Sequence, residues 1–323
     1  MYAGIVRIIM IPVNEKGFFY LFRKEFYEQI TNTYDRITGT KAPPFIRSFK
    51  PASDKLQIKT SGAENMCKKA ILVVSFGTSH NETRRKTIDQ IEKDISKNYP
   101  DWKIYRAFTS NIIIKILKNR DRLLVNTVNE AMEQMFTDGI SEVIVQPTHI
   151  INGIENDNMK IAIQNWRNRF KSVKIGAPLL TSAEDYHKVI TALIKELPEL
   201  QNDEAVVYMG HGTTHYSNTS YPALEYMFRD YGYEDIYIAT VEAYPTLDNV
   251  IKQLKKKDYK KVILVPFMIV AGDHAVNDMA GEEEDSWKSI LERLGYNVGY
   301  SLKGLGEYKR IRNIFIEHVA KAD

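Results

Sequence analysis

The feature that most constrains the fold of this chain is an internal repeat that relates its two halves. The segment Val74-Ser-Phe-Gly-Thr78 matches Met209-Gly-His-Gly-Thr213, and Glu142-Val-Ile-Val-Gln-Pro147 matches Lys261-Val-Ile-Leu-Val-Pro266. The matching segments follow one another in the same order in both halves. The repeat therefore predicts two structural units that share one architecture.

Short β-branched runs alternate with helical patterns from residue 70 onward. After the first run, Ile88, Ile91 and Ile95 are spaced like the buried face of a helix. Strands that are buried on both faces and separated by helices are typical of parallel sheets covered by helices. We predict eight such strands, four in each half: Ile71–Phe76, Ile104–Phe108, Glu142–Pro147, Val173–Gly176, Ala205–Met209, Ile236–Val241, Lys261–Pro266 and Asn297–Leu302.

The predicted fold class is α/β, with two similar doubly wound parallel-sheet lobes that arise by internal duplication and enclose a central cleft. Residues 66–200 form the N-terminal lobe, and residues 201–323 form the C-terminal lobe with the metal site. Residues 1–65 lack both the repeat and the periodicity. We interpret them as an N-terminal extension that is disordered or not translated, with Met66 as an alternative start.

Composition and charge exclude several classes of partner. The chain is 44% hydrophobic and 26% charged, as expected for a globular protein. Its net charge of +3 comes from residues 1–65, so the remainder is close to neutral and we expect no nucleic-acid partner. No apolar run approaches the roughly 18 residues of a membrane span, so we expect no membrane partner. The single cysteine, Cys67, excludes an internal disulfide and fits a cytoplasmic location.

Three metal-binding residue types follow three strands of the second half. His211 and Glu242 come directly after predicted strands, and His274 follows the next strand through a short turn. Ligands of doubly wound sheets bind beyond the carboxyl ends of the strands, so we expect these side chains to converge in the cleft. Two imidazoles and a carboxylate suit a divalent transition metal such as cobalt, iron, nickel or zinc.

The repeat also identifies the positions that correspond to these residues in the first half. Phe76 matches His211, Ser110 matches Glu242, and Glu155 matches His274. We expect Phe76, Ser110 and Glu155 to face the metal ligands across the cleft. His149, which follows a strand of the first half, either lines the cleft or has a structural role.

Each residue also has a simpler interpretation. The turn Gly210-His-Gly-Thr213 alone fits a tight strand-to-helix connection or a phosphate cradle, although it lacks a dinucleotide fingerprint and the lysine of a P-loop. Glu242 could instead cap the helix that begins near Thr246. The other histidines are interpreted as solvated or as supporting the site from behind it: His80, His187, His215 and His318.

Several motifs together resemble those of the anaerobic sirohydrochlorin cobaltochelatases, which are class II, ATP-independent tetrapyrrole chelatases. The resemblance covers residue 68 to about residue 320. It rests on six segments: Val73-Val-Ser-Phe-Gly-Thr-Ser79, Tyr105-Arg-Ala-Phe-Thr-Ser110, Gln146-Pro-Thr-His-Ile-Ile-Asn-Gly153, Gly210-His-Gly-Thr213, Val241-Glu-Ala-Tyr-Pro245, and Ala271-Gly-Asp-His274 through Asp278-Met-Ala-Gly281.

This resemblance implies a lyase of anaerobic cobalamin biosynthesis that inserts Co²⁺ into sirohydrochlorin with release of two protons. Co²⁺ would be both substrate and bound metal, and no nucleotide would be needed. His211, Glu242 and His274 would carry the metal-binding and catalytic roles. The residues expected to bind the tetrapyrrole are Phe76, Gly77, Thr78, Ser79, Ser110, His149, Glu155, Gly212 and Thr213.

Several alternatives remain open at this point. Iron or nickel could be the physiological metal in place of cobalt, because all three accept the same ligand types. The protein could instead be a non-catalytic two-lobed protein that binds tetrapyrrole or metal, or a transferase that uses phosphate or nucleotide. The sequence does not determine the oligomeric state, and a homo-oligomer is among the alternatives.

Overall fold

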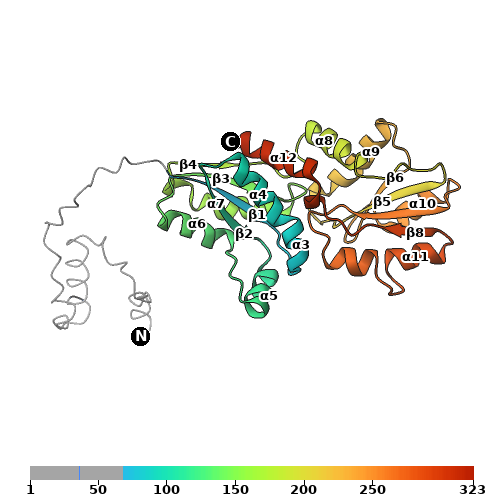
Figure 1. Cartoon of the computed structure of the whole chain (residues 1–323), viewed down its shortest axis with the longest axis horizontal. Coiled ribbons are helices and arrows are strands. Elements are labelled where there is room, and N and C mark those ends of the chain that lie inside the picture. Colours follow the sequence, from blue (N-terminus) through green and yellow to red (C-terminus); the bar gives the residue numbers. More distant parts are fainter. Residues whose placement is uncertain (1–35, 37–67) are drawn as a thin grey trace. The chain divides into compact units, whose positions relative to one another are not determined.

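The computed structural model describes Arg36 and residues 68–323. The chain divides into two compact units, Met1–Glu64 and Asn65–Asp323. The fold presented below is that of the second unit (Figure 1). The interpretation of residues 1–65 as an extension lies, apart from Arg36, outside the described residues.

The first lobe is built on a four-stranded parallel sheet with strand order β2-β1-β3-β4. Each predicted strand of this half is present, with bounds that differ by at most two residues. The elements of the lobe are β1 (Lys69–Ser75), α3 (Asn81–Lys86), α4 (Ile88–Asn98), β2 (Lys103–Phe108), α5 (Asn111–Asp121), α6 (Val128–Thr137), β3 (Glu142–Pro147), α7 (Ile154–Gln164), β4 (Ser172–Ile175) and α8 (Ala183–Ile194).

The second lobe repeats this architecture with strand order β6-β5-β7-β8. The equivalent strands occupy equivalent places in the two sheets, which confirms the fold class predicted from the repeat. The elements are β5 (Glu204–Gly210), α9 (Ser220–Asp230), β6 (Ile236–Thr240), α10 (Leu247–Leu254), β7 (Lys261–Pro266), the π-helical turn η4 (His274–Met279), α11 (Trp287–Arg293) and β8 (Asn297–Tyr300). The last helix of the chain, α12 (Lys309–Ala320), follows them.

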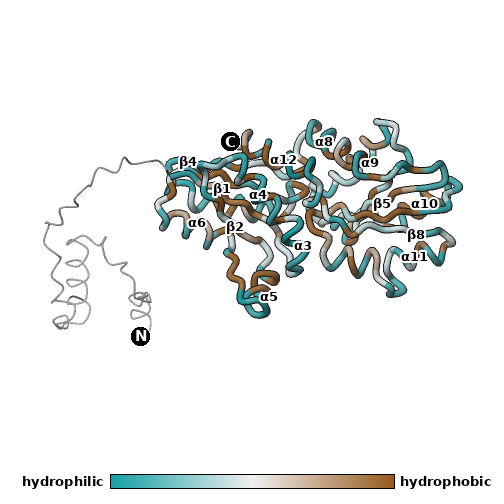
Figure 2. The backbone as a smooth tube through the Cα atoms, in the orientation of Figure 1, coloured by the Kyte–Doolittle hydropathy of each residue, from teal (hydrophilic) through white to brown (hydrophobic). Residues whose placement is uncertain are grey.

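Helices cover both faces of each sheet because the central strands are apolar on both sides. In β1, Leu72 packs in a core with Met132 of α6, whereas its neighbour Val73 faces a second core that contains Ile91 of α4. In the second lobe, Val207 faces a core under α10 and α11. Figure 2 shows these hydrophobic strands running through the middle of both lobes.

The strand pairing brings the carboxyl ends of three strands to one edge of each sheet. In the second lobe, Met209 of β5 pairs with Ala239 of β6 and with Pro266 of β7. The first lobe has the same register, with Val74 of β1 paired to Ala107 and Pro147. The residues that follow these strands are therefore close in space although they are far apart in the sequence.

The C-terminal helix α12 packs against α4 and α8 of the first lobe. Its His318 is buried, so the interpretation of this residue as solvated or as supporting the site was wrong. One ring nitrogen hydrogen-bonds the Ala177 carbonyl oxygen at 2.9 Å, and the other hydrogen-bonds Asp185 at 2.8 Å. Burial favours a higher pKa for Asp185, but hydrogen bonds from His318 and Ser182 outweigh it and hold the pKa below its usual value. His318 thus fastens α12 to the first lobe.

Among the described residues, no helix has the length and apolar character to cross a membrane.

Candidate metal centre

The three proposed metal ligands lie at the ends of neighbouring strands in the second lobe. His211 follows the central strand β5, and Glu242 lies two residues beyond β6 on one side of it. His274 begins the turn η4 beyond β7, on the other side of β5. The topology of the lobe therefore places all three at one edge of the sheet, as the positions in the repeat indicate.

The functional atoms of these residues form one cluster. One ligand atom from each of His211, Glu242 and His274 lies within 4.8 Å of the other two. The Glu242 carboxylate also faces the His211 ring, with Oε2 3.6 Å from Nδ1. Ligand atoms at 2.0–2.2 Å from a tetrahedral ion are about 3.5 Å apart, so the side chains would need to move together by about an ångström to share one ion. The arrangement is suited to hold one divalent ion.

Hydrogen bonds orient both imidazoles so that the same ring nitrogen is available on each. The Nδ1–H of His211 donates to the carbonyl oxygen of Gly212 at 3.0 Å. Nδ1 of His274 hydrogen-bonds a carboxylate oxygen of Asp278, one turn further along η4. Because both partners are acceptors, each Nδ1 donates a hydrogen, and Nε2 is the ring nitrogen that remains for a metal ion. A carboxylate behind a histidine is also a common way to fix a metal-binding imidazole.

Asp278 is a residue whose contribution sequence reasoning missed. In the sequence it stands in the motif Asp278-Met-Ala-Gly281, which by itself indicates no role for it. The signal was the spacing of four residues between His274 and Asp278, which places two side chains on the same face of a helical segment.

Two glycines form equivalent tight turns after the central strands of the two lobes. Gly77 and Gly212 have φ angles of +102° and +84°, which side chains other than glycine rarely adopt. A Cβ at Gly77 would lie 2.5 Å from the Phe108 ring, and one at Gly212 would lie 2.8 Å from Thr240. Both turns therefore require glycine. Each follows a residue that lines the cavity directly after the strand, Phe76 in the first lobe and His211 in the second.

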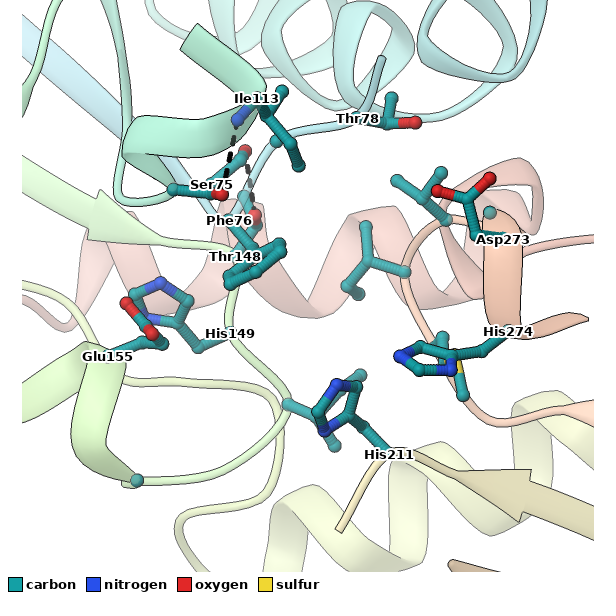
Figure 3. A pocket seen from close by; sticks show the side chains of 18 of the residues that line it. Ser75, Phe76, Thr78, Ile113, Thr148, His149, Glu155, His211, Asp273 and His274 are labelled. Atoms are coloured by element: carbon teal, nitrogen blue, oxygen red, sulfur yellow. Dashed lines mark hydrogen bonds between the residues drawn. The ribbon is translucent and has the colours of Figure 1, made fainter. Parts of the chain in front are cut away.

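The cluster lies in a cavity of about 580 Å³ whose walls come from both lobes. Figure 3 shows His211 and His274 on one side of this cavity, with Phe76 and His149 on the other. The structure brings together all the residues predicted to bind metal or tetrapyrrole, since every one lines the cavity: Phe76, Gly77, Thr78, Ser79, Ser110, His149, Glu155, His211, Gly212, Thr213, Glu242 and His274.

His149 lines the cavity but is itself buried, with 9% of its surface exposed. Neither ring nitrogen has a hydrogen-bond partner among the described residues. Burial lowers the pKa of His149 to about 4, so the imidazole is neutral near pH 7. His149 therefore lines the cavity, as one of its two interpretations expects, and is also buried, as the structural interpretation expects.

Two histidine–aspartate pairs connect the lobes, and their histidines occupy equivalent positions in the repeat. His80 follows β1, and its Nε2 lies 2.8 Å from Asp273 of the second lobe. His215 follows β5, and its Nε2 lies 3.3 Å from Asp157 of the first lobe. In both loops a threonine side chain two residues earlier accepts a hydrogen bond from the histidine backbone. The pairs hold the loops that carry the site against the opposite lobe.

The interpretation of Glu242 as a helix cap is wrong. Helix α10 begins at Leu247, and Thr246 and Asn249 form the capping box at its N-terminus. The Glu242 side chain is instead 56% exposed and faces His211. The Glu242 carboxylate is therefore available as a metal ligand.

The fold and the site together define a two-lobed chelatase. The solved structure of SirB from Bacillus subtilis with Fe³⁺ has the same fold, with a TM-score of 0.56 at 16% sequence identity. The match covers 79% of this chain and 95% of that chain. The chain belongs to the cobalt chelatase (CbiK) family, whose pattern matches residues 69–323.

Two curated relatives support this membership and confirm the resemblance found in the sequence motifs. The sirohydrochlorin cobaltochelatase of Salmonella typhimurium is 39% identical over 255 residues, which cover 79% of this chain and 96% of the relative. The sirohydrochlorin cobaltochelatase CbiKC of Nitratidesulfovibrio vulgaris is 34% identical over 260 residues, which cover 80% of this chain and 91% of the relative. The family is one of metal chelatase enzymes.

Proposed function

We propose that the protein is a sirohydrochlorin cobaltochelatase, which inserts Co²⁺ into sirohydrochlorin and releases two protons in anaerobic cobalamin biosynthesis. The observation that carries this proposal is the cluster of His211, Glu242 and His274 in the inter-lobe cavity. The two curated relatives are sirohydrochlorin cobaltochelatases, which supports the choice of metal and macrocycle.

In the proposed mechanism, His211, Glu242 and His274 bind the incoming Co²⁺ and replace part of its hydration shell. Each imidazole uses Nε2, because its Nδ1–H is already engaged with Gly212 or Asp278. A lone pair that binds cobalt cannot accept a proton at the same time. When cobalt passes to the ring nitrogens, the two freed Nε2 atoms become available for the two pyrrole protons.

The stoichiometry of this exchange is balanced without a redox step or a nucleotide. The free-base ring loses two N–H protons and gains one Co²⁺, so the metal stays divalent and the charge is conserved. Glu242 contributes a negative charge that favours the cation before transfer and stabilises an imidazolium after it. We infer that the enzyme needs no ATP.

We assign the tetrapyrrole to the remaining wall of the cavity. Phe76, Ser110 and Glu155 come from the first lobe, where they occupy the positions that correspond to the three metal ligands in the repeat. Backbone amides near Gly77 and Gly212 are suited to receive carboxylates of the macrocycle. The residues proposed to contact the macrocycle are Phe76, Gly77, Thr78, Ser79, Ser110, His149, Glu155, Gly212 and Thr213.

The experiment that tests this function is anaerobic incubation of the protein with sirohydrochlorin and Co²⁺, followed by absorbance. We expect the spectrum to change from free base to cobalt complex, at a rate proportional to protein concentration and independent of added ATP. Stoichiometric binding of the macrocycle with no enhancement of insertion would instead identify a non-catalytic binding protein. Parallel reactions with Fe²⁺ and Ni²⁺ measure the alternative metals.

We further propose that the enzyme acts in the cytoplasm. The boundaries 66–200 and 201–323 stay a prediction for the two lobes, and residues 1–65 stay assigned to an extension. Helix α12 is part of the second range in sequence but packs on the first lobe.

A further inference from the structure

The first lobe presents an unusual set of exposed apolar side chains to the cavity. Phe76, Ile112, Ile116 and Ile154 are 48%, 72%, 38% and 44% exposed, and all four line it. Isolated apolar side chains on a surface need no explanation, but a group of large ones that faces a single cavity marks a binding surface. We call these four residues the apolar platform.

Helix α5 is placed so that it can present this surface. Ser110 caps its N-terminus by accepting a hydrogen bond from Ile113 N, and Leu117 anchors it in a small core with Ile88. Ile112 and Ile116 are four residues apart and therefore share one helical face, which points away from that core. In Figure 2, part of α5 has the brown colouring of hydrophobic residues.

The charges of the cavity do not match those of the substrate carboxylates. Among the described residues, no lysine or arginine lines the cavity, whereas Glu155, Glu242 and Asp273 do. Sirohydrochlorin carries eight carboxylates, and like charges inside a partly enclosed site repel one another. Among the described residues, the cavity lining therefore offers the peripheral carboxylates only uncharged donors, such as the backbone amides near Gly77 and Gly212.

We propose that the apolar platform binds one face of the tetrapyrrole ring, and that the enzyme recognises its substrate by this face while most carboxylates stay in solvent. This inference rests on the proposed function, because it takes a tetrapyrrole as the occupant. The platform and the metal cluster line the same cavity from opposite lobes. The first lobe would thus hold the ring while the second lobe delivers the metal to it.

The test measures the Kd of metal-free sirohydrochlorin by absorbance or fluorescence titration, without turnover. The double variant Ile112→Ser, Ile116→Ser removes apolar area without adding charge. We expect its Kd to rise by on the order of tenfold or more, because burial of each isoleucine contributes to affinity. The matched control is Ile161→Ser, an isoleucine in α7 that is 65% exposed and does not line the cavity. Its Kd should equal that of the wild type.

Ionic strength provides a second, independent measurement. Binding through the ring face should leave the wild-type Kd unchanged, or lower it, between about 0.05 and 0.5 M salt, since salt only screens repulsion. A Kd that rises severalfold with salt would show attachment through carboxylates and overturn the inference. Equal Kd values for the double variant and the control would overturn it as well. A double variant that changed self-association in sedimentation, but not the Kd for the macrocycle, would also overturn it.

The outcome is separable from that of the proposed function. Wild-type protein that inserts cobalt but binds the ring independently of Ile112 and Ile116 refutes the platform alone. Wild-type protein that binds the ring through the platform but never inserts cobalt refutes the chelatase activity alone.

Discussion

The imidazole rings of His211 and His274 meet edge to face, with centroids 4.8 Å apart and planes at 84°. With Glu242 they form a nitrogen–oxygen ligand set without a thiolate. Such a set binds Fe²⁺, Co²⁺ and Ni²⁺ with affinities that follow the general order for divalent metals.

We therefore predict that the enzyme inserts Co²⁺ and Fe²⁺, and also Ni²⁺ in vitro, in matched anaerobic assays with sirohydrochlorin. Chelation of the free metal with EDTA before the macrocycle is added should stop the reaction in each case. If only one of the three metals were inserted, ligand type would not be the selecting feature.

Replacement of Glu242 by glutamine should separate metal binding from macrocycle binding. The variant keeps the shape of the side chain but removes the charge that lies 3.6 Å from His211. We expect the Kd for Co²⁺ to rise roughly tenfold or more, with little change in the Kd for sirohydrochlorin. Calorimetric titration with each ligand measures both. A variant that lost the macrocycle and kept the metal would contradict the assignment.

The hydrogen bond between Asp278 and His274 should matter for metal affinity although Asp278 is not placed as a ligand. Partners of this kind typically contribute about 10–100-fold to affinity or activity. Asp278→Asn is expected to weaken Co²⁺ binding within that range and to lower the insertion rate. Asp248→Asn, which removes an exposed carboxylate at the first turn of α10, serves as the control. Equal effects of the two substitutions would mean that Asp278 does not orient His274.

The buried imidazole of His149 predicts a specific dependence of stability on pH. Burial lowers its pKa in the folded protein to about 4, whereas in the unfolded chain the value is near 6.5. Below pH 6.5 the unfolded chain binds a proton that the folded protein does not. The free energy of unfolding should therefore fall as the pH decreases from about 6.5 to about 4, by up to about 3 kcal/mol.

Denaturant unfolding at steps of pH measures this effect. In the His149→Gln variant, the part of the decrease that belongs to this window should disappear, while other titrating groups keep their contribution. Identical pH profiles for the variant and the wild type would show that His149 is not held neutral by the fold.

The sequence repeat predicts much of this structure, because it reports on positions within one lobe. The alternation of strands and helices predicts the two parallel sheets, and equivalent positions such as Phe76 and His211 indicate which residues meet at the sheet edge. The repeat also relates the turns at Gly77 and Gly212, and both of these glycines have a positive φ angle.

Contacts between the lobes are not predictable in this way. His80 and Asp273 are 193 residues apart, and no periodicity in the sequence relates them. The same holds for His318, whose buried partner Asp185 lies in the other half of the chain. Hydrophobic patterns indicate which face of a helix is buried but not which lobe covers it. For this reason the packing of α12 on the first lobe and the burial of His318 are seen only in the structure.

The most direct test of the metal centre is the rate of Co²⁺ insertion by His211→Ala and His274→Ala variants at neutral pH, measured alongside sirohydrochlorin binding. We predict that each variant folds and binds the macrocycle, because the apolar platform and the turns of both lobes remain. Insertion should fall by more than roughly a hundredfold, since loss of groups that only orient a ligand already costs about 10–100-fold. Wild-type insertion rates in both variants would contradict the account.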